Sequence, residues 1–182
     1  MTKAILITGS GTRIGAFLAK NLSKNGWAVA IHYNKSRDSA ELLSEEIRAS
    51  GGEVALVKAD LSISDDLDVL IKKASENLGL RLTALINNAS TFEEDSLESF
   101  TNSSFDYHMD INLRAPIILS QKFAEQLPSN TKGQIINIID QRVLNSDPSF
   151  FTYSISKSAL FWATKTMAQT LAPNIRVNAI GP

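Results

Sequence analysis

The pattern that most restricts the fold of this chain is an alternation of short apolar runs with longer amphipathic segments. Short continuous apolar runs suit strands that are buried on both faces, as parallel strands are. The predicted strands cover residues 3–8, 27–33, 53–58, 82–87, 133–139 and 174–179, and the predicted helices cover 16–25, 36–50, 65–78, 102–126 and 151–171. Strands that alternate with helices predict an α/β fold, a doubly wound parallel sheet with helices on both faces.

Composition narrows the classes of partner. The 182 residues are enough for one domain with a sizeable core, and the net charge of −1 gives no basic field for nucleic acid. The absence of cysteine excludes disulfides and thiolate metal sites, and the two histidines, His32 and His108, belong to no ligand cluster. We therefore expect neither a nucleic-acid partner nor a metal.

The sequence also gives no sign of a membrane segment. No apolar run approaches the roughly 20 residues that a membrane helix needs. The N-terminus leads directly into an apolar strand without the layout of a signal peptide. We expect a protein of the cytoplasm with no membrane partner.

A glycine-rich loop follows the first predicted strand and opens a helix, the place where a dinucleotide pyrophosphate binds in a Rossmann fold. Gly9 permits a tight turn, Gly11 permits close approach of the backbone, and Gly15 permits tight packing of helix on strand. Glycines that serve only the turn would give the same pattern. The position between strand and helix favours dinucleotide binding.

Tyr153 and Lys157 open the last predicted helix four residues apart, and so they share one face. A cation near a phenol lowers its pKa by roughly 1–3 pH units. We expect this pair to act as a general acid near physiological pH, with Tyr153 as the proton donor. A solvated helical face is the alternative reading of the pair taken alone.

Several motifs together resemble the short-chain dehydrogenase/reductase family over nearly the whole chain. They are Thr8-Gly9 with Gly15, Asp60-Leu61, Asn87-Asn88-Ala89-Ser90, Asn112, Tyr153-x-x-x-Lys157 and the segment from Asn178 to Pro182. The resemblance implies catalytic roles for Asn112, Asp140, Tyr153 and Lys157. It implies a dinucleotide site made by Gly9, Gly11, Thr12, Arg13, Ile14, Gly15, Tyr33, Asn34, Lys35, Ser36, Asp60, Leu61, Asn88, Ala89, Ser90, Tyr153 and Lys157.

Two departures from the common family pattern point to a subgroup. Most members carry glycine where Arg13 stands and serine where Asp140 stands. Both residues, with Ser90 followed by Phe92, resemble the pteridine reductases, which include bacterial dihydromonapterin reductases. This resemblance implies that the substrate binds Arg13, Ser90, Phe92, Asp140 and Tyr153. The alternatives to substrate binding are that Arg13 contacts only a cofactor phosphate, that Phe92 anchors its loop and that Asp140 forms a turn.

The residues after the second predicted strand favour NADP(H) over NAD(H). A protein that prefers NAD usually has an acidic residue there, which binds the ribose 2′-hydroxyl. The chain instead has Asn34, Lys35 and Ser36. A cation and a hydroxyl suit a 2′-phosphate.

Pro116 follows Asn112 by four residues and has no N–H with which to bond the Asn112 carbonyl. We therefore expect a kink in the helix 102–126. The family resemblance adds a water held between Asn112 and Lys157. A kink without this proton relay is the alternative.

The sequence thus predicts an NADPH-dependent reductase of a small pteridine-like substrate. Alternatives are a carbonyl reductase, such as a 3-oxoacyl-carrier-protein reductase, or a truncated dinucleotide-binding protein without activity. The last alternative arises because residues 1–182, read as one domain, stop after the sixth strand without the family's usual substrate loop and last strand. Family members pair the helix that contains Phe161 and Trp162 with a neighbour, so we expect a homo-oligomer, a dimer or tetramer.

Overall fold

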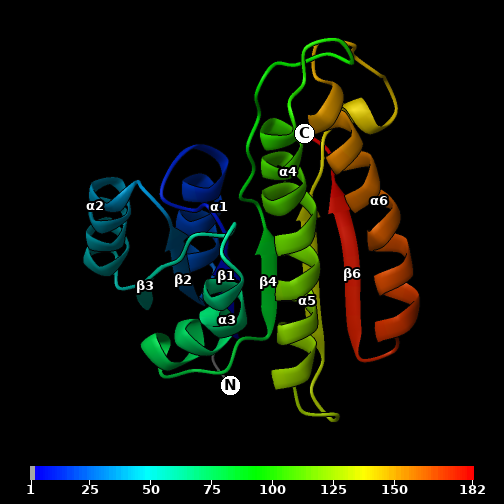
Figure 1. The fold of residues 1–182 in the computed structure, drawn as a ribbon. Coiled ribbons are helices and arrows are strands. Elements are labelled where there is room, and N and C mark those ends of the chain that lie inside the picture. Colours follow the sequence, from blue (N-terminus) through cyan, green and yellow to red (C-terminus); the bar gives the residue numbers. More distant parts are fainter. Residues whose placement is uncertain (1–2) are drawn as a thin grey trace.

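The computed structural model describes residues 3–182 and confirms the doubly wound α/β fold. Six parallel strands form one sheet in the order β3-β2-β1-β4-β5-β6 (Figure 1). The strands are β1 (Lys3–Ile7), β2 (Trp27–Tyr33), β3 (Val54–Lys58), β4 (Ala84–Asn87), β5 (Gly133–Ile138) and β6 (Ile175–Ile180). Each lies within two residues of its predicted range.

Helices connect the strands and cover the sheet (Figure 1). They are α1 (Arg13–Lys24), α2 (Arg37–Ala49), α3 (Ser64–Leu78), α4 (Asn102–Met109), α5 (Ala115–Gln126) and α6 (Phe151–Leu171). Within the described residues, no helix combines the length and the apolar character that crossing a bilayer demands.

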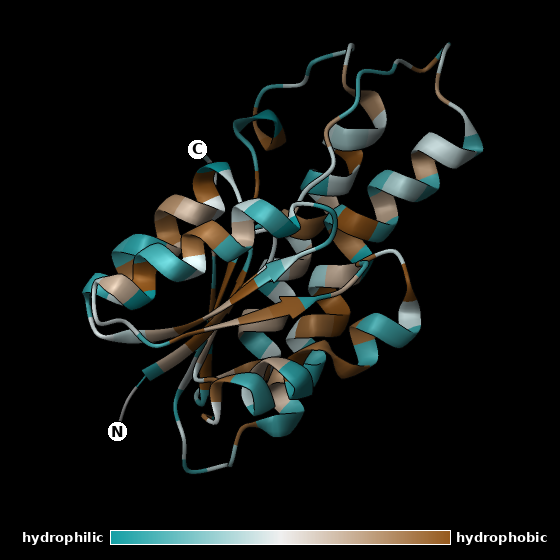
Figure 2. Ribbon diagram, turned by 90° about the vertical axis from the view of Figure 1, so that its left-hand side faces the viewer, coloured by the Kyte–Doolittle hydropathy of each residue, from teal (hydrophilic) through white to brown (hydrophobic). Residues whose placement is uncertain are grey.

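Two apolar layers hold the helices to the sheet. One joins α3, α5 and α6 to the strands and includes the buried residues Leu70, Leu119 and Phe123. The other joins α1 and α2 to the opposite face and includes Val29 and Ile31. Alternate residues from Ala4 to Ile7 in β1 and from Ala28 to Ile31 in β2 face opposite layers, so the central parts of both strands are apolar on both faces (Figure 2).

The predicted long helix 102–126 contains a π-helical turn between two α-helical parts, and the kink itself stays a prediction. Between α4 and α5, a π-helical turn (η1, Asp110–Arg114) widens the backbone, and the Ala115 N–H bonds the carbonyl of Asp110. Pro116 lies at the start of α5, where its missing N–H is tolerated best. Asn112 therefore lies inside the widened turn, fully buried.

Three local features differ from the sequence predictions. Helix α1 begins at Arg13, three residues earlier than predicted, because Thr12 is already the extended N-cap. Helix α2 begins at Arg37, one residue later than predicted, because Ser36 is its N-cap. The predicted loop 140–150 contains a short 3₁₀ turn, Gln141–Val143, stabilised where the Arg142 N–H donates to Asp140 Oδ1.

The sheet order places a topological switch between β1 and β4, since the chain winds outward from β1 to β3 and then crosses to β4. In such sheets, ligands bind outside the carboxyl ends of the strands at the switch point. The loops after β1, β4 and β5 meet there.

Candidate active site

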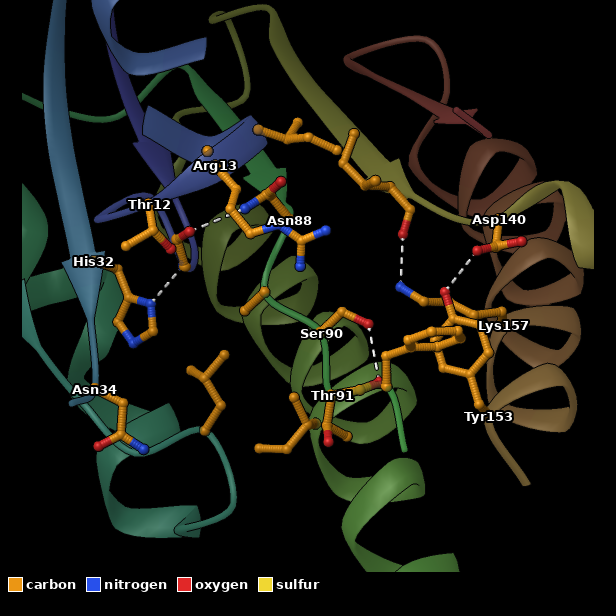
Figure 3. Close-up of a pocket in the computed structure, with 18 of the residues that line it drawn as sticks. Thr12, Arg13, His32, Asn34, Asn88, Ser90, Thr91, Asp140, Tyr153 and Lys157 are labelled. Atoms are coloured by element: carbon orange, nitrogen blue, oxygen red, sulfur yellow. Dashed lines mark hydrogen bonds between the residues drawn. The ribbon is translucent and has the colours of Figure 1, made fainter. Parts of the chain in front are cut away.

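A cavity of about 730 Å³ opens at the carboxyl ends of the strands (Figure 3). Its wall contains most of the predicted site residues, which are Gly9, Thr12, Arg13, Ile14, Gly15, Tyr33, Asn34, Lys35, Ser36, Leu61, Asn88, Ala89, Ser90, Phe92, Asp140, Tyr153 and Lys157. Gly11, Asp60 and Asn112 lie outside this lining. Residues 3–182 contain no group of three acidic or histidine side chains that could hold a metal ion.

The glycine loop is packed as closely as its sequence predicted. Gly9 has a φ of +61°, and Gly15 lies so near the loop that an added β-carbon would come within 2.5 Å of the Gly9 carbonyl oxygen. A β-carbon at Gly11 would meet Ser36 Oγ at 2.7 Å, so the glycine lets the loop pack closely against the start of α2. Its predicted approach to a dinucleotide stays a prediction.

His32 braces this loop, a role that its position in the second predicted strand did not reveal. The Gly9 N–H donates to His32 Nδ1 at 2.9 Å, and His32 Nε2 lies 3.2 Å from the Ala59 carbonyl oxygen (Figure 3). Nδ1 must therefore be the acceptor and Nε2 the protonated nitrogen. Burial lowers the pKa of His32 to about 4, so the ring is neutral at physiological pH.

Asn88 and Thr8 fix the loop after β4 against the loop after β1. Asn88 Nδ2 donates to the carbonyls of Thr8 and Gly9, at 2.9 and 3.1 Å. The Thr8 hydroxyl accepts from the N–H groups of Asn88 and Ala89. The two loops therefore form one rigid wall of the cavity.

Arg13 has a φ of +50°, the left-handed region that a residue with a β-carbon enters at a cost of about 1–2 kcal/mol. The backbone thus keeps a conformation suited to glycine while carrying a guanidinium into the cavity wall. Such strain is typical of functional positions.

Tyr153 and Asp140 meet on the opposite wall (Figure 3). The Tyr153 hydroxyl donates to Asp140 Oδ2 at 2.9 Å. Asp140 Oδ1 accepts from the Arg142 backbone N–H at 2.8 Å and lies 3.4 Å from the Arg142 guanidinium. Burial tends to raise the pKa of Asp140, but these three donors outweigh it and keep that pKa below its usual range. Asp140 is therefore ionised at neutral pH.

The expectation that Lys157 lowers the pKa of Tyr153 is wrong for this structure. Burial, and then the hydrogen bond to the Asp140 carboxylate, raise the pKa of Tyr153 well above its usual range. Lys157 Nζ bonds the Ile138 carbonyl at 2.9 Å and lies 5.8 Å from the centre of the tyrosine ring. Burial lowers the pKa of Lys157 itself to about 8, despite the opposing charge of Asp140.

Asn112 reaches the site through its neighbours. Its Oδ1 accepts from the Thr91 N–H at 2.9 Å and from the Ser90 hydroxyl at 3.0 Å. Its Nδ2 donates to the Thr91 carbonyl and to Ser156 Oγ. The side chain thus joins the loop after β4 to α6, and the predicted water between Asn112 and Lys157 stays a prediction.

Aromatic side chains line the outer part of the cavity. The Phe92 ring stacks on Phe150 with centroids 4.3 Å apart and meets Tyr153 edge-on at 4.7 Å. The Arg142 guanidinium lies 5.3 Å from the centre of the Phe92 ring and pairs with Asp147 as well as Asp140. Sequence reasoning missed Arg142, although its place two residues after Asp140 was a usable signal.

A family model for short-chain dehydrogenases matches residues 3–182. The chain belongs to this family. The Tyr153–Lys157 helix and the glycine loop thus stand in the order and fold that the motifs indicated. Membership of this family of oxidoreductases agrees with the position of the cavity at the topological switch point of the sheet.

Individual relatives place the chain within the short-chain dehydrogenases. It is 42% identical to FolM alternative dihydrofolate reductase 1 from Brucella canis, solved with NADP, with a TM-score of 0.94 over 99% of this chain and 72% of that one. The Brucella suis protein of the same name, also with NADP, is 43% identical, with a TM-score of 0.94 over 99% and 74%. The 3-oxoacyl-[acyl-carrier-protein] reductase FabG of Staphylococcus epidermidis is 32% identical over 100% of this chain and 75% of its own.

Comparison of Arg13→Gly with Arg13→Ala should isolate the backbone strain. Both changes remove the guanidinium, but alanine keeps the β-carbon that the positive φ disfavours. We expect Arg13→Gly to be more stable than Arg13→Ala by about 1 kcal/mol in urea unfolding. Equal stabilities, or a more stable Arg13→Ala, would contradict a left-handed Arg13.

Asp140→Asn should lower the pKa of Tyr153 towards its usual value near ~10, because it removes the carboxylate that disfavours the phenolate. Ultraviolet titration suits this test, since the chain has only three tyrosines. The titration step that is missing in Tyr153→Phe is the one that belongs to Tyr153. An unchanged tyrosine titration in Asp140→Asn would show that the two side chains do not interact.

Proposed function

We propose that this protein is an NADPH-dependent reductase of a pteridine-like substrate of the dihydropterin or dihydrofolate type. The observation that carries the proposal is the hydrogen bond between Tyr153 and the Asp140 carboxylate, in place of the serine usual in the family. The similarity to the two Brucella FolM proteins supports it.

The cavity suits a dinucleotide. Glycines at positions 9 and 15 form a cradle that β-carbons would fill, and it opens at the first turn of α1, where backbone N–H groups favour phosphate. Asn34, Lys35 and Ser36 line the same cavity at the end of β2. Lys35 and Ser36 would hold the 2′-phosphate of NADPH, and Leu61 and Ala89 would line the path of the bases. When bound, the cofactor would supply the hydride.

The chain's own residues would move the proton. Tyr153 and Asp140 share one proton at neutral pH, carried by the phenol, because the pKa of Asp140 is low and that of Tyr153 is high. A phenol of raised pKa gives up its proton only to a strong base. A ring nitrogen that gains electrons as hydride reaches the adjacent carbon becomes such a base. The Lys157 ammonium would then face the phenolate and stabilise it.

The substrate would lie against the aromatic wall. Phe92 is 51% exposed, and Phe150 stacks on one of its faces and holds the ring in place. The exposed part of Phe92 could therefore contact the flat ring of the substrate. Arg13 and Ser90 line the same space and carry donors for the polar edge of a pterin.

A β-keto thioester is the second candidate substrate, favoured by the similarity to FabG over the entire chain. A ketone needs one proton donor at its oxygen, and it has no need of a charged group beside the tyrosine. Asp140 is the feature that separates the two candidates.

We also infer that copies of this chain associate through α6. Trp162 is 69% exposed on that helix, and its neighbour Phe161 is partly exposed, so two aromatic side chains are available on the solvent side of α6. Sedimentation of the purified protein tests this inference, and a monomer at micromolar concentration would contradict it.

Lys35→Asp should reduce or reverse the preference for NADPH over NADH, because it removes a phosphate partner and adds a ribose partner. Calorimetric titration of both cofactors against the unmodified and altered proteins measures the change. Arg37→Asp, one residue beyond Ser36 and paired with Glu41, is a control for charge alone. Equal affinity of the unmodified protein for the two cofactors would refute the NADPH assignment.

The substrate is tested by following NADPH oxidation with dihydropterins and acetoacetyl thioesters side by side. We expect higher kcat/KM with a dihydropterin. Phe92→Ala should raise KM for it several-fold while leaving NADPH affinity nearly unchanged, since an aromatic stack is worth roughly 0.5–1.5 kcal/mol beyond its area. A protein that prefers the thioester to every pterin would refute the substrate while leaving the family unchanged.

A further inference from the structure

Three buried side chains from different segments form a chain of hydrogen bonds behind Tyr153. His108 comes from α4, Thr152 from the first turn of α6, and Asp95 from the loop between β4 and α4. His108 and Thr152 are fully buried, and Asp95 is 7% exposed. Nothing in the proton transfer proposed above uses them.

The bonds in this chain fix where each proton lies. The Glu93 N–H donates to His108 Nε2 at 3.2 Å, so that nitrogen is the acceptor and Nδ1 carries the proton. Nδ1 lies 2.7 Å from Thr152 Oγ1 and donates to it. The Thr152 hydroxyl and N–H in turn both donate to the Asp95 carboxylate.

Two members of this chain, Thr152 and His108, are linked through the backbone to the two side chains that would meet the substrate. Thr152 precedes Tyr153, and Glu93, whose N–H is held by His108, follows Phe92. The backbone of Asp95 adds bonds to Ser149 and Phe151 at 3.1 and 3.2 Å. The rings of His108 and Tyr153 also meet edge-on, with centroids 6.1 Å apart.

We propose that Asp95, Thr152 and His108 are positioning residues, which set the Tyr153 hydroxyl and the Phe92 ring relative to each other for substrate reduction. The proposal rests on the proposed function in so far as Tyr153 is the proton donor. The three residues lie on the α6 side of the cavity, away from the glycine loop and Lys35. Their loss should therefore affect turnover and substrate affinity while leaving NADPH affinity unchanged.

Thr152→Val removes the hydroxyl and keeps the shape, and Thr152→Ser restores the hydroxyl. We expect kcat/KM to fall roughly 10- to 100-fold in Thr152→Val, because small displacements of reacting groups have effects of this size. Thr152→Ser should stay near the unmodified rate, and NADPH affinity should change less than about twofold in both. These rates are measured with whichever of the two substrate classes the protein reduces.

Thr164→Val is the matched control for stability. Thr164 is a buried threonine on the same helix, bonded to Leu160 and Asn137 away from the cavity. Its loss should lower the midpoint of thermal unfolding without the fall in kcat/KM. Equal falls in Thr152→Val and Thr164→Val would overturn the positioning role.

Nuclear magnetic resonance of the two histidines tests the hydrogen-bond chain without any substrate. Nitrogen-15 shifts should show opposite tautomers, with the proton on Nε2 in His32 and on Nδ1 in His108. In Thr152→Val the ultraviolet titration of Tyr153 should move to lower pH, because its bond to Asp140 loosens. A proton on Nε2 of His108, or a Tyr153 titration unaffected in Thr152→Val, would overturn the proposal.

If the protein reduces neither substrate class, the proposed function is refuted. The nitrogen-15 shifts of the histidines and the ultraviolet titration of Tyr153 need no substrate, so they still decide the positioning role.

Discussion

The structure depends on satisfying polar side chains that are buried where the parallel strands end. The buried Thr8 hydroxyl, directly after β1, accepts from the N–H groups of Asn88 and Ala89, directly after β4. Asn88 Nδ2 in turn donates to the carbonyls of Thr8 and Gly9 at 2.9 and 3.1 Å. A buried group left without a partner costs about 1–3 kcal/mol. Because these partners come from the protein, the carboxyl edge of the sheet is rigid before any ligand arrives.

The two walls of the cavity, one next to β1 and one next to α6, differ in the charge of the side chains that form them. On the β1 side, neutral side chains hold the backbone, as His32 does for Gly9. On the α6 side, ionisable groups are close together, and burial pushes Tyr153 and Lys157 towards their uncharged forms. Asp140, in contrast, is held ionised by its bonds from Arg142 and from the Tyr153 hydroxyl. A site arranged in this way can bind on one side and exchange a proton on the other with little mutual disturbance.

The sequence was sufficient for the fold and for most of the cavity wall, because both follow from local patterns. Apolar runs, glycine spacing and the i, i+4 relation of Tyr153 and Lys157 are readable along the chain. It was insufficient for contacts that depend on burial depth. The pKa of Tyr153 was assigned the wrong direction, because burial and then the hydrogen bond to the Asp140 carboxylate raise it, while Lys157 bonds the Ile138 carbonyl. His32 and Arg142 were missed for the same reason, because their partners are distant in sequence or lie in an irregular loop.

The stack of Phe92 on Phe150 joins two loops that are far apart in the sequence. Backbone bonds between Asp95, Ser149 and Phe151 reinforce the connection. Neither loop can therefore move alone without separating the rings. In a chimera, exchanging residues 140–150 with those of a relative would leave the partner ring facing an unrelated surface. The loop that contains Phe92 and the loop that contains Phe150 therefore form one structural unit. We expect substitutions in the two loops to occur together when substrate preference changes.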